Sequence, residues 1–433
     1  MGAPARTARI IVYNIILEDC RVFGQEIMAD ILLITSLYVP TVCGIGDYSH
    51  RLAEGLRERG HSVHILAGGD AGPEDNTHAV TRVADWSRGE VQAIAARVAR
   101  EQYTHVLLQY APSAYSRKGA LPPIAGLPRA IKQAAPNCQV ITTLHELFYI
   151  TMRREWRRIP RNMTVGLGQR GSLLPLLRWS DVCVATTDQR QAFLARFMPY
   201  ARIGRGAAPV LEIPIGTNID VVAMTDEEKA DLRRALGLDG RFVLGTFSAA
   251  WEADMVLAAL QAARAAGVPA RLLAIGMTED RMRAMAPARY PPLAEAVVCT
   301  GRLSSEDVSR HLQCVDLYLL PLIDGVSSRR TTLLAALSHG LPVVGTAGRT
   351  TDNKMRGVTS LTLTRGGDQP AFTAAVLQMC RDTSRRLAMG HAARALYEAQ
   401  YRWDSIAARY DKLIVPISPP LGKAQTSMET YGA

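Results

Sequence analysis

One stretch constrains the fold of this chain more than any other. Residues 317–346 read LYLLPLIDGVSSRRTTLLAALSHGLPVVGT. The apolar run Leu317–Leu320 predicts a buried strand, residues 331–338 predict a small-residue helix that ends at Gly340, and Pro342–Thr346 predicts a second buried strand. A strand, loop, helix and strand in this order predict an α/β domain with a parallel sheet.

The loop between the first strand and the helix is polar and rich in small residues. A Gly/Ser loop that leads into a helix N-terminus can bind an anion, because free backbone N–H groups and the helix dipole point at the bound group. Arg329 and Arg330 add positive charge in a geometry suited to phosphate oxygens. The alternative is an ordinary turn with a solvated arginine pair, and the pattern alone does not choose between the two.

The bulk properties narrow the class of protein. A length of 433 residues predicts two or three domains, and no apolar run reaches the roughly 18 to 20 residues that span a bilayer. Seven scattered cysteines without a CxxC pair indicate neither a disulfide framework nor a zinc site, and favour a reduced, cytoplasmic setting. The net charge of +10 favours anionic partners such as nucleotides, phospholipid surfaces or nucleic acid, although nothing in the chain resembles a nucleic-acid recognition module.

The first half of the chain predicts a second α/β domain. Ile31–Ile34 reads as a buried strand, Gly44-Ile45-Gly46-Asp47 as a glycine turn, residues 49–60 as an amphipathic helix, and His61–Leu66 as the next strand. The glycines would let a ligand approach the backbone closely. The pattern is not the GxGxxG of dinucleotide-binding proteins, which makes an oxidoreductase improbable.

Two further features of this half are candidate functional elements. His145 directly follows the predicted strand Gln139–Leu144, where ligands bind in α/β sheets, although it could equally bond to a neighbouring backbone group. A basic cluster could face a membrane surface or an acidic acceptor, or could be an ordinary solvated face. Its members are Arg153, Arg154, Arg157 and Arg158.

The second half repeats the α/β pattern. Strands are predicted at Phe242–Phe247, Arg271–Ile275 and Val297–Thr300, before the two already described. Ser304 and Asp307 form a predicted N-cap pair for the helix that follows. The predicted organisation is an extension (1–29), a first domain (30–205), a linker (206–217), a second domain (218–395), a C-terminal helix (396–413) and a disordered tail (414–433).

Six segments in this order resemble the GT-B glycosyltransferases, and more narrowly the retaining family-four enzymes, also called glycosyl transferases group 1. They are GIGDYSHRLAEGLRERGHSVHIL, TLHEL, IPIGTNID, TGRLSSEDVSRHLQCVDLYLLP, LLAALSHGLPVVGT and YRWDSIAARY. The resemblance covers about residues 30 to 413. It implies two Rossmann-like parallel-sheet domains that face each other across a cleft, the first for the acceptor and the second for a nucleotide-sugar donor.

The chain departs from the family pattern at the donor site. The family usually has two glutamates with seven residues between them, and these positions are Ser327 and Ala335 here. The family's Arg and Lys would lie in the segment GTFSAAWEADM, which holds no basic residue. Arg329 and Arg330 are the predicted replacements, with Arg302 as a weaker third candidate.

The resemblance implies transfer of a sugar from a nucleotide-sugar, with UDP- and GDP-sugars favoured, to a sugar-containing, lipid-linked or small-molecule acceptor. It implies retention and no metal, with His145 at the donor sugar, whereas Asp47 or His50 would be the base in an inverting enzyme. A non-catalytic sugar-binding relative and a sugar epimerase remain alternatives. The predicted donor-binding residues are Gly44, Ile45, Gly46, Arg302, Leu303, Gly325, Val326, Ser327, Ser328, Arg329, Arg330 and Thr331.

Overall fold

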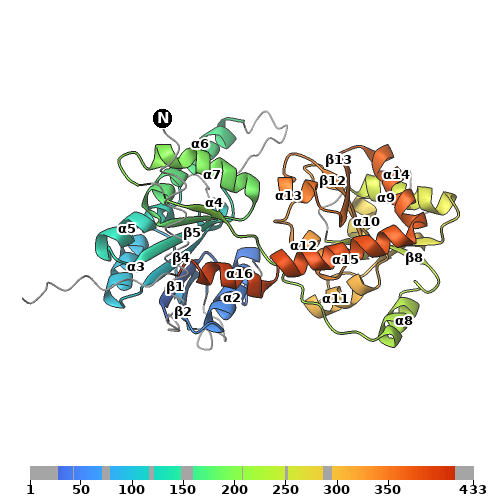
Figure 1. Ribbon diagram of the computed structural model, residues 1–433, viewed down its shortest axis with the longest axis horizontal. Helices are drawn as coiled ribbons and strands as arrows, with labels where there is room; N and C mark the ends of the chain where they lie inside the picture. Colours follow the sequence, from blue (N-terminus) through green and yellow to red (C-terminus); the bar gives the residue numbers. More distant parts are fainter. Residues whose placement is uncertain are drawn as a thin grey trace, which may run out of the picture. The chain divides into compact units, whose positions relative to one another are not determined.

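The computed structural model contains two parallel α/β sheets (Figure 1). It describes residues 28–41, 43–70, 79–116, 121–147, 159–206, 208–248, 252–285 and 295–414, and only the backbone of 159–166. By its contacts the chain divides into two compact units. Among the described residues, the first unit contains those up to Cys183, Tyr200–Pro209 and 407–414, and the second contains Val184–Pro199 and Val210–Ile406.

The first sheet has seven strands in the order β3-β2-β1-β4-β5-β6-β7. The parallel register places Ile31 of the central strand β1 beside both Val63 of β2 and His105 of β4. Strands β4 and β6 are fully buried, which explains their almost continuous apolar sequences. The strands are β1 (Asp30–Thr35), β2 (Ser62–Gly68), β3 (Val80–Val83), β4 (His105–Tyr110), β5 (Gln139–Leu144), β6 (Val182–Ala185) and β7 (Val210–Glu212).

Helices connect the strands of this sheet as crossovers. Helix α2 packs against β1 and β2, whereas α3, η1, α5 and α6 pack against one another. The connecting helices are α2 (Gly44–Arg57), α3 (Arg88–Arg100), α4 (Pro112–Tyr115), the 3-10 helix η1 (Pro123–Gly126), α5 (Leu127–Ala134), α6 (Ile159–Trp179) and α7 (Asp188–Ala201).

The second sheet has six strands in the order β10-β9-β8-β11-β12-β13. Counted along the chain, this is the doubly wound order 3-2-1-4-5-6, so the connection changes direction between β8 and β11. Ligands bind outside the carboxyl ends of the strands at such a switch point. The strands are β8 (Phe242–Phe247), β9 (Ala270–Ile275), β10 (Val297–Cys299), β11 (Leu317–Leu320), β12 (Val343–Ala347) and β13 (Leu361–Arg365).

The two faces of the second sheet bury alternate side chains of the same strands. Leu317 and Leu319 pack into one apolar cluster with α9 and α14, and Tyr318 and Leu320 pack into another with α11 and α12. Helices on both faces therefore fix β11, and the loop that follows it begins from a rigid strand. The helices of this half are α8 (Asp226–Ala235), α9 (Ala253–Ala265), α10 (Glu279–Met285), α11 (Ser305–Gln313), α12 (Thr331–Ser338), α13 (Asn353–Arg356), α14 (Gln369–Arg381) and α15 (Thr383–Gln400).

The last helix, α16 (Trp403–Asp411), ends within the first unit, which includes the chain from Ala407. Its Tyr410 hydroxyl lies 2.7 Å from Thr143 Oγ1 and accepts a hydrogen bond from the Tyr48 hydroxyl at 3.0 Å. Asp411 lies 3.0 Å from Nε2 of His61. Buried polar contacts thus attach the end of the chain to β5 and α2.

The predicted fold class is confirmed, since both halves are parallel-sheet α/β structures. The glycine turn was placed wrongly, because Gly44, Gly46 and Asp47 lie within the first turn of α2 rather than before it. The edge strands β3 and β13 were not predicted. The N-cap prediction is confirmed, because Ser304 Oγ accepts from Asp307 N at 3.1 Å.

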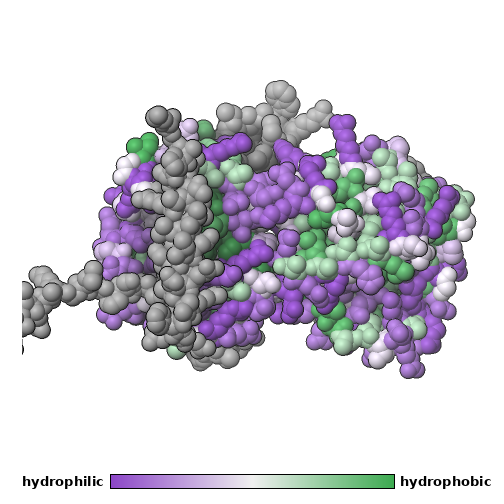
Figure 2. Space-filling model, in the orientation of Figure 1, coloured by the Kyte–Doolittle hydropathy of each residue, from purple (hydrophilic) through white to green (hydrophobic). Residues whose placement is uncertain are grey.

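No helix among the described residues is long and apolar enough to cross a bilayer. The described surface visible in Figure 2 is mostly hydrophilic, with apolar residues in small separate groups. The six cysteines within the described part of the chain form no disulfide.

Candidate active site

A polar hollow of about 240 Å³ lies at the switch point of the second sheet. Residues after the carboxyl ends of β8 and β11 meet the first turn of α12 there. The lining residues are Phe247, Ser248, Leu320, Leu322, Arg329, Arg330, Thr331 and Thr332. The loop that the sequence predicted as an anion site therefore borders a hollow in the place where doubly wound folds bind ligands.

The N-terminus of α12 has unused hydrogen-bond donors. The carbonyl of the N-cap residue, Arg330, accepts from the amides of Leu333 and Leu334, and no side chain caps the helix. Among the described residues no hydrogen bond uses the amides of Thr331 or Thr332. These two N–H groups and the helix dipole give the hollow a positive potential.

The two arginines add full charges to this potential. Arg329 is exposed and Arg330 is half-buried. Burial lowers the pKa of the Arg330 guanidinium, and the neighbouring Arg329 charge lowers it further. A bound anion would relieve this repulsion between adjacent cations, so the arrangement favours a ligand with more than one negative charge.

The residues before the arginines do not line the hollow. Gly325 has a φ of +86°, and the Val326 amide donates to Thr346 O at 2.8 Å. Ser327 and Ser328 are 1% and 4% exposed, and both bond to the carboxylate of Asp352. These four residues shape the loop, whereas Arg329, Arg330 and Thr331 border the hollow.

Arg302 and Leu303 lie between β10 and α11 and do not line the hollow either. Arg302 is exposed, and Leu303 packs against the apolar cluster that contains Tyr318. The structure therefore does not bring these two predicted residues to the arginine pair.

In the first unit, the predicted residues gather at the start of α2. A Cβ on Gly46 would lie 3.0 Å from Leu37 O, so the helix approaches this backbone more closely than a larger residue permits, whereas Gly44 has open space around its Cα. Ile45 and Asp47 are half-buried in the same turn. Cys43 is the N-cap and makes no side-chain cap bond.

His145 lies beside this turn. Its Nε2 is 2.8 Å from Gln109 Oε1, and its backbone amide donates to Tyr110 O at 2.9 Å. Its ring lies edge-on to the Tyr48 ring, with 4.7 Å between the ring centroids. Gln109 is fully buried, and its Nε2 has no hydrogen-bond partner among the described residues. His145 is thus held by a buried side chain whose NH2 group makes no hydrogen bond among the described residues.

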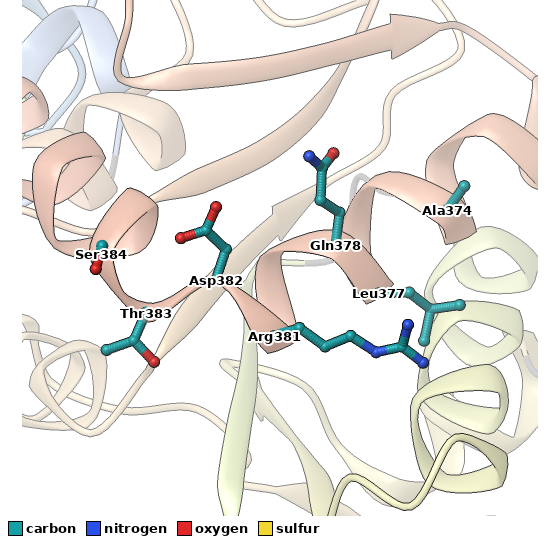
Figure 3. Close-up of a pocket in the computed structure, with 7 residues that line it drawn as sticks. All are labelled: Ala374, Leu377, Gln378, Arg381, Asp382, Thr383 and Ser384. Carbon is teal, nitrogen blue, oxygen red and sulfur yellow. The ribbon is translucent and has the colours of Figure 1, made fainter.

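Two other features carry no comparable chemistry. A larger hollow of about 680 Å³ lies where α14 meets α15. Arg381 points back along α14 toward Leu377, whereas Gln378 and Asp382 point in another direction (Figure 3). Charged groups therefore do not converge in this hollow. The described residues contain no group of three or more potential metal ligands. The predicted basic cluster at Arg153, Arg154, Arg157 and Arg158 lies outside the described residues.

Two protein families match the two halves of the chain. The model described as Glycosyltransferase Family 4 matches residues 42–205, and the model described as Glycosyl transferases group 1 matches residues 241–382. The chain is a GT-B glycosyltransferase of this group.

Curated relatives of this glycosyltransferase are mannosyltransferases. It is 26% identical over 316 residues to the GDP-mannose-dependent monoacylated alpha-(1-6)-phosphatidylinositol monomannoside mannosyltransferase of Corynebacterium glutamicum, covering 68% of this chain and 74% of the relative. It is 27% identical over 260 residues to the GDP-mannose-dependent alpha-(1-6)-phosphatidylinositol monomannoside mannosyltransferase of Mycolicibacterium smegmatis, covering 56% of this chain and 66% of the relative.

Solved structures share its fold at low identity. Sucrose-phosphate synthase from Thermosynechococcus elongatus superposes with a TM-score of 0.65 and 18% identity, over 89% of this chain and 98% of that one. Anabaena HepE in complex with UDP and glucose superposes with a TM-score of 0.61 and 17% identity, over 89% and 99% of the two chains.

The sequence did not reveal two residues that contact predicted site residues: Gln109, which contacts His145, and Asp352, which contacts Ser327. Gln109 is the second-last residue of strand β4, and a polar residue near the carboxyl end of a buried strand was an available signal. Asp352 gives the weaker signal of a helix N-cap, which does not reveal its contact with the loop before Arg329.

Proposed function

We propose that this glycosyltransferase moves a hexose from a nucleotide-sugar to an acceptor hydroxyl, with retention and without a metal. The observation that carries the proposal is the hollow where Arg329, Arg330 and the free amides of α12 converge. In this proposal residues 218–395 form the donor domain, and residues 30–205 form the acceptor domain.

The reaction explains why this charge is needed. When the bond between the sugar and the nucleoside diphosphate breaks, negative charge builds up on the leaving phosphate. Preorganised N–H donors and cations stabilise that charge in the transition state. The two guanidinium groups and the α12 amides supply what a divalent cation supplies elsewhere, which supports a metal-independent reaction.

GDP-mannose is the favoured donor. Both curated relatives are named as GDP-mannose-dependent mannosyltransferases, whereas HepE, a relative in fold, binds UDP and glucose. UDP-glucose is therefore the alternative donor.

In the first domain, His145 contacts the donor sugar, and Gly44–Gly46 approach the diphosphate and acceptor. The hydrogen bond that His145 Nε2 donates to Gln109 Oε1 fixes the imidazole ring, which suits a group that orients the sugar. In a retaining reaction Asp47 has no role as base, and it would take that role only if the anomeric configuration inverted.

The acceptor is proposed to be an anionic, lipid-linked sugar. The relatives are named for phosphatidylinositol mannosides. Helix α6 exposes Leu167 and Leu174 seven residues apart, on one side of the helix, with exposed Arg170 between them. Apolar and basic side chains together suit the surface of an anionic membrane, and the overall charge of +10 adds to this attraction.

The test is a transfer assay with GDP-mannose or UDP-glucose and phosphatidylinositol mannoside in vesicles, each with and without EDTA. We expect transfer from GDP-mannose, an α-linked product by NMR, and less than a twofold effect of EDTA. Transfer from neither donor, together with no thermal shift by GDP or UDP, would refute the proposal. A β-linked product would refute retention, and loss of activity in EDTA that Mg²⁺ restores would refute metal independence.

A further inference from the structure

Asp352 is buried and does not cap its own helix. It is the N-cap residue of α13, a position where an Asp carboxylate normally accepts from the first turn, yet it makes no cap bond. It is 2% exposed. Its oxygens accept instead from Ser327 Oγ at 3.1 Å and from Ser328 N at 2.5 Å, across 25 and 24 residues of sequence.

These bonds continue to the arginine pair. Ser327 Oγ, which donates to Asp352, also accepts from the amide of Arg329 at 3.4 Å. The carbonyl of Ser327 accepts from the amide of Arg330 at 3.0 Å. One carboxylate therefore holds the turn from which both guanidinium side chains project.

The rest of the loop is held by backbone contacts to the same neighbouring segment. Val326 N donates to Thr346 O at 2.8 Å, and Thr350 N donates to Asp324 O at 2.9 Å. These bonds fix the half of the loop nearer β11. The Asp352 bonds lie at the other half, where the loop enters α12.

Stability alone does not explain this carboxylate. Burial raises the pKa of Asp352, and the nearby charge of Asp188 raises it further, against the lowering effect of the Ser327 and Ser328 bonds. No salt bridge to Asp352 is present among the described residues. Desolvation of a buried carboxylate that has no salt bridge offsets part of what its hydrogen bonds contribute to stability. The bonds to Ser327 and Ser328 also place this carboxylate where it can order the loop that leads to Arg329 and Arg330.

We propose that Asp352 is a positioning residue that holds the loop before α12, so that Arg329 and Arg330 are preset to bind the nucleoside diphosphate. The inference rests on the proposed donor site, but the conformation of the loop can be measured without any ligand. Because the carboxylate already restricts the turn before the donor binds, the loop loses less conformational entropy on binding.

The experiment compares wild type, Asp352→Asn and Ser327→Ala in the full chain. Asparagine keeps the shape of Asp352 but has no charge, and one of its two terminal atoms is an NH2 donor instead of an acceptor oxygen. Amide hydrogen exchange of Ser328, Arg329 and Arg330 is measured without ligand, together with Tm and the Kd for GDP and UDP. The matched control is Asp368→Asn, because Asp368 also accepts from a backbone amide, that of Ala371, but at the start of α14.

In Asp352→Asn we expect faster exchange at the three amides, a roughly tenfold weaker Kd, which is the weight of one charge-assisted hydrogen bond, and an unchanged or higher Tm. Ser327→Ala should change exchange and Kd in the same direction, and Asp368→Asn should change neither. Wild-type exchange in Asp352→Asn, or weaker binding only in proportion to a lower Tm, would overturn the inference. If wild type binds neither GDP nor UDP, the proposed donor site fails, whereas the exchange data still decide whether Asp352 holds the loop.

Discussion

Helices α2 and α12 both begin near the carboxyl ends of strands in a parallel sheet, and both sheets contain the strand order 3-2-1-4-5-6. Each follows a strand at a switch point, β1 for α2 and β11 for α12. Their first turns differ in charge. The first turn of α2 contains two glycines and Asp47, whereas that of α12 contains no acid and follows Arg329 and Arg330.

This difference shows that the fold provides a position and the side chains decide its ligand. Asp47 partly compensates the dipole of α2 from within the helix. The dipole of α12 is reinforced by two cations and remains available to a ligand. We therefore expect anion binding to depend on the start of α12, and the geometry of sugar transfer to depend on the residues around α2.

The largest expected effect comes from removing the cations before α12. The double variant Arg329→Ala/Arg330→Ala should lose on the order of 1,000-fold in kcat/KM, because charge on the leaving phosphate is then unstabilised. Among single variants, loss of half-buried Arg330 should cost more than loss of exposed Arg329. The measurement is steady-state kinetics with varied donor, with Arg310→Ala, whose surface arginine pairs with Asp307, as control. A double variant with wild-type kcat/KM would remove the distinction between the two helices.

The next effect concerns stability and contrasts two glycines. A Cβ on Gly325 would overlap Gly348 N and Thr351 Oγ1, and its φ of +86° strains any other residue. Gly325→Ala should therefore lower the free energy of unfolding by about 3 kcal/mol, whereas Gly44→Ala, with open space, should change it by less than about 0.5 kcal/mol. Urea unfolding measures both. Equal losses of unfolding free energy in the two variants would show that the loop before α12 accommodates an added methyl group as readily as the start of α2.

Buried parallel strands were the most predictable part of this fold. Gln139–Leu144 and Phe242–Phe247 were predicted with the observed limits, because strands covered on both faces are rich in apolar and β-branched residues and contain no charge. The edge strands β3 and β13, VTRV and LTLTR, are only partly buried and mix polar with apolar residues. The start of α2 at Gly44 depends on packing of Gly46 against Leu37, which overrides the low helix propensity of glycine.

The candidate site was predictable only where its residues are neighbours in sequence. Arg329, Arg330 and the helix after them form one continuous pattern, and the structure places them around one hollow. The contact of Ser327 with Asp352 spans 25 residues, and that of His145 with Gln109 spans 36. Such pairs depend on strand order, which a single sequence does not specify at the level of side chains.

The third prediction addresses the other side of the comparison. His145→Ala should lower kcat about 100-fold while the Kd for GDP stays within twofold, because His145 orients the sugar and does not bind the phosphates. Single-turnover rates and nucleotide titration separate the two effects. His64→Asn is the control, since His64 lies on β2 and bonds to Thr81. A weaker Kd with unchanged kcat would assign His145 to nucleotide binding, contrary to the proposed division.

The smallest effect tests whether the residues around α2 depend on the end of the chain. Burial raises the pKa of Tyr410 to about 12, so its phenol stays protonated at neutral pH and can bond to both Tyr48 and Thr143. Tyr410→Phe leaves these two buried hydroxyls without that partner, which should lower the free energy of unfolding by about 1 to 2 kcal/mol. Urea unfolding measures this loss, with exposed Tyr200→Phe as the matched control. The Kd for GDP should stay at its wild-type value, because Arg329 and Arg330 belong to the other unit. If the Kd changed as well, the first turns of α2 and α12 would be energetically coupled, and their separate roles in geometry and in anion binding would have to be abandoned.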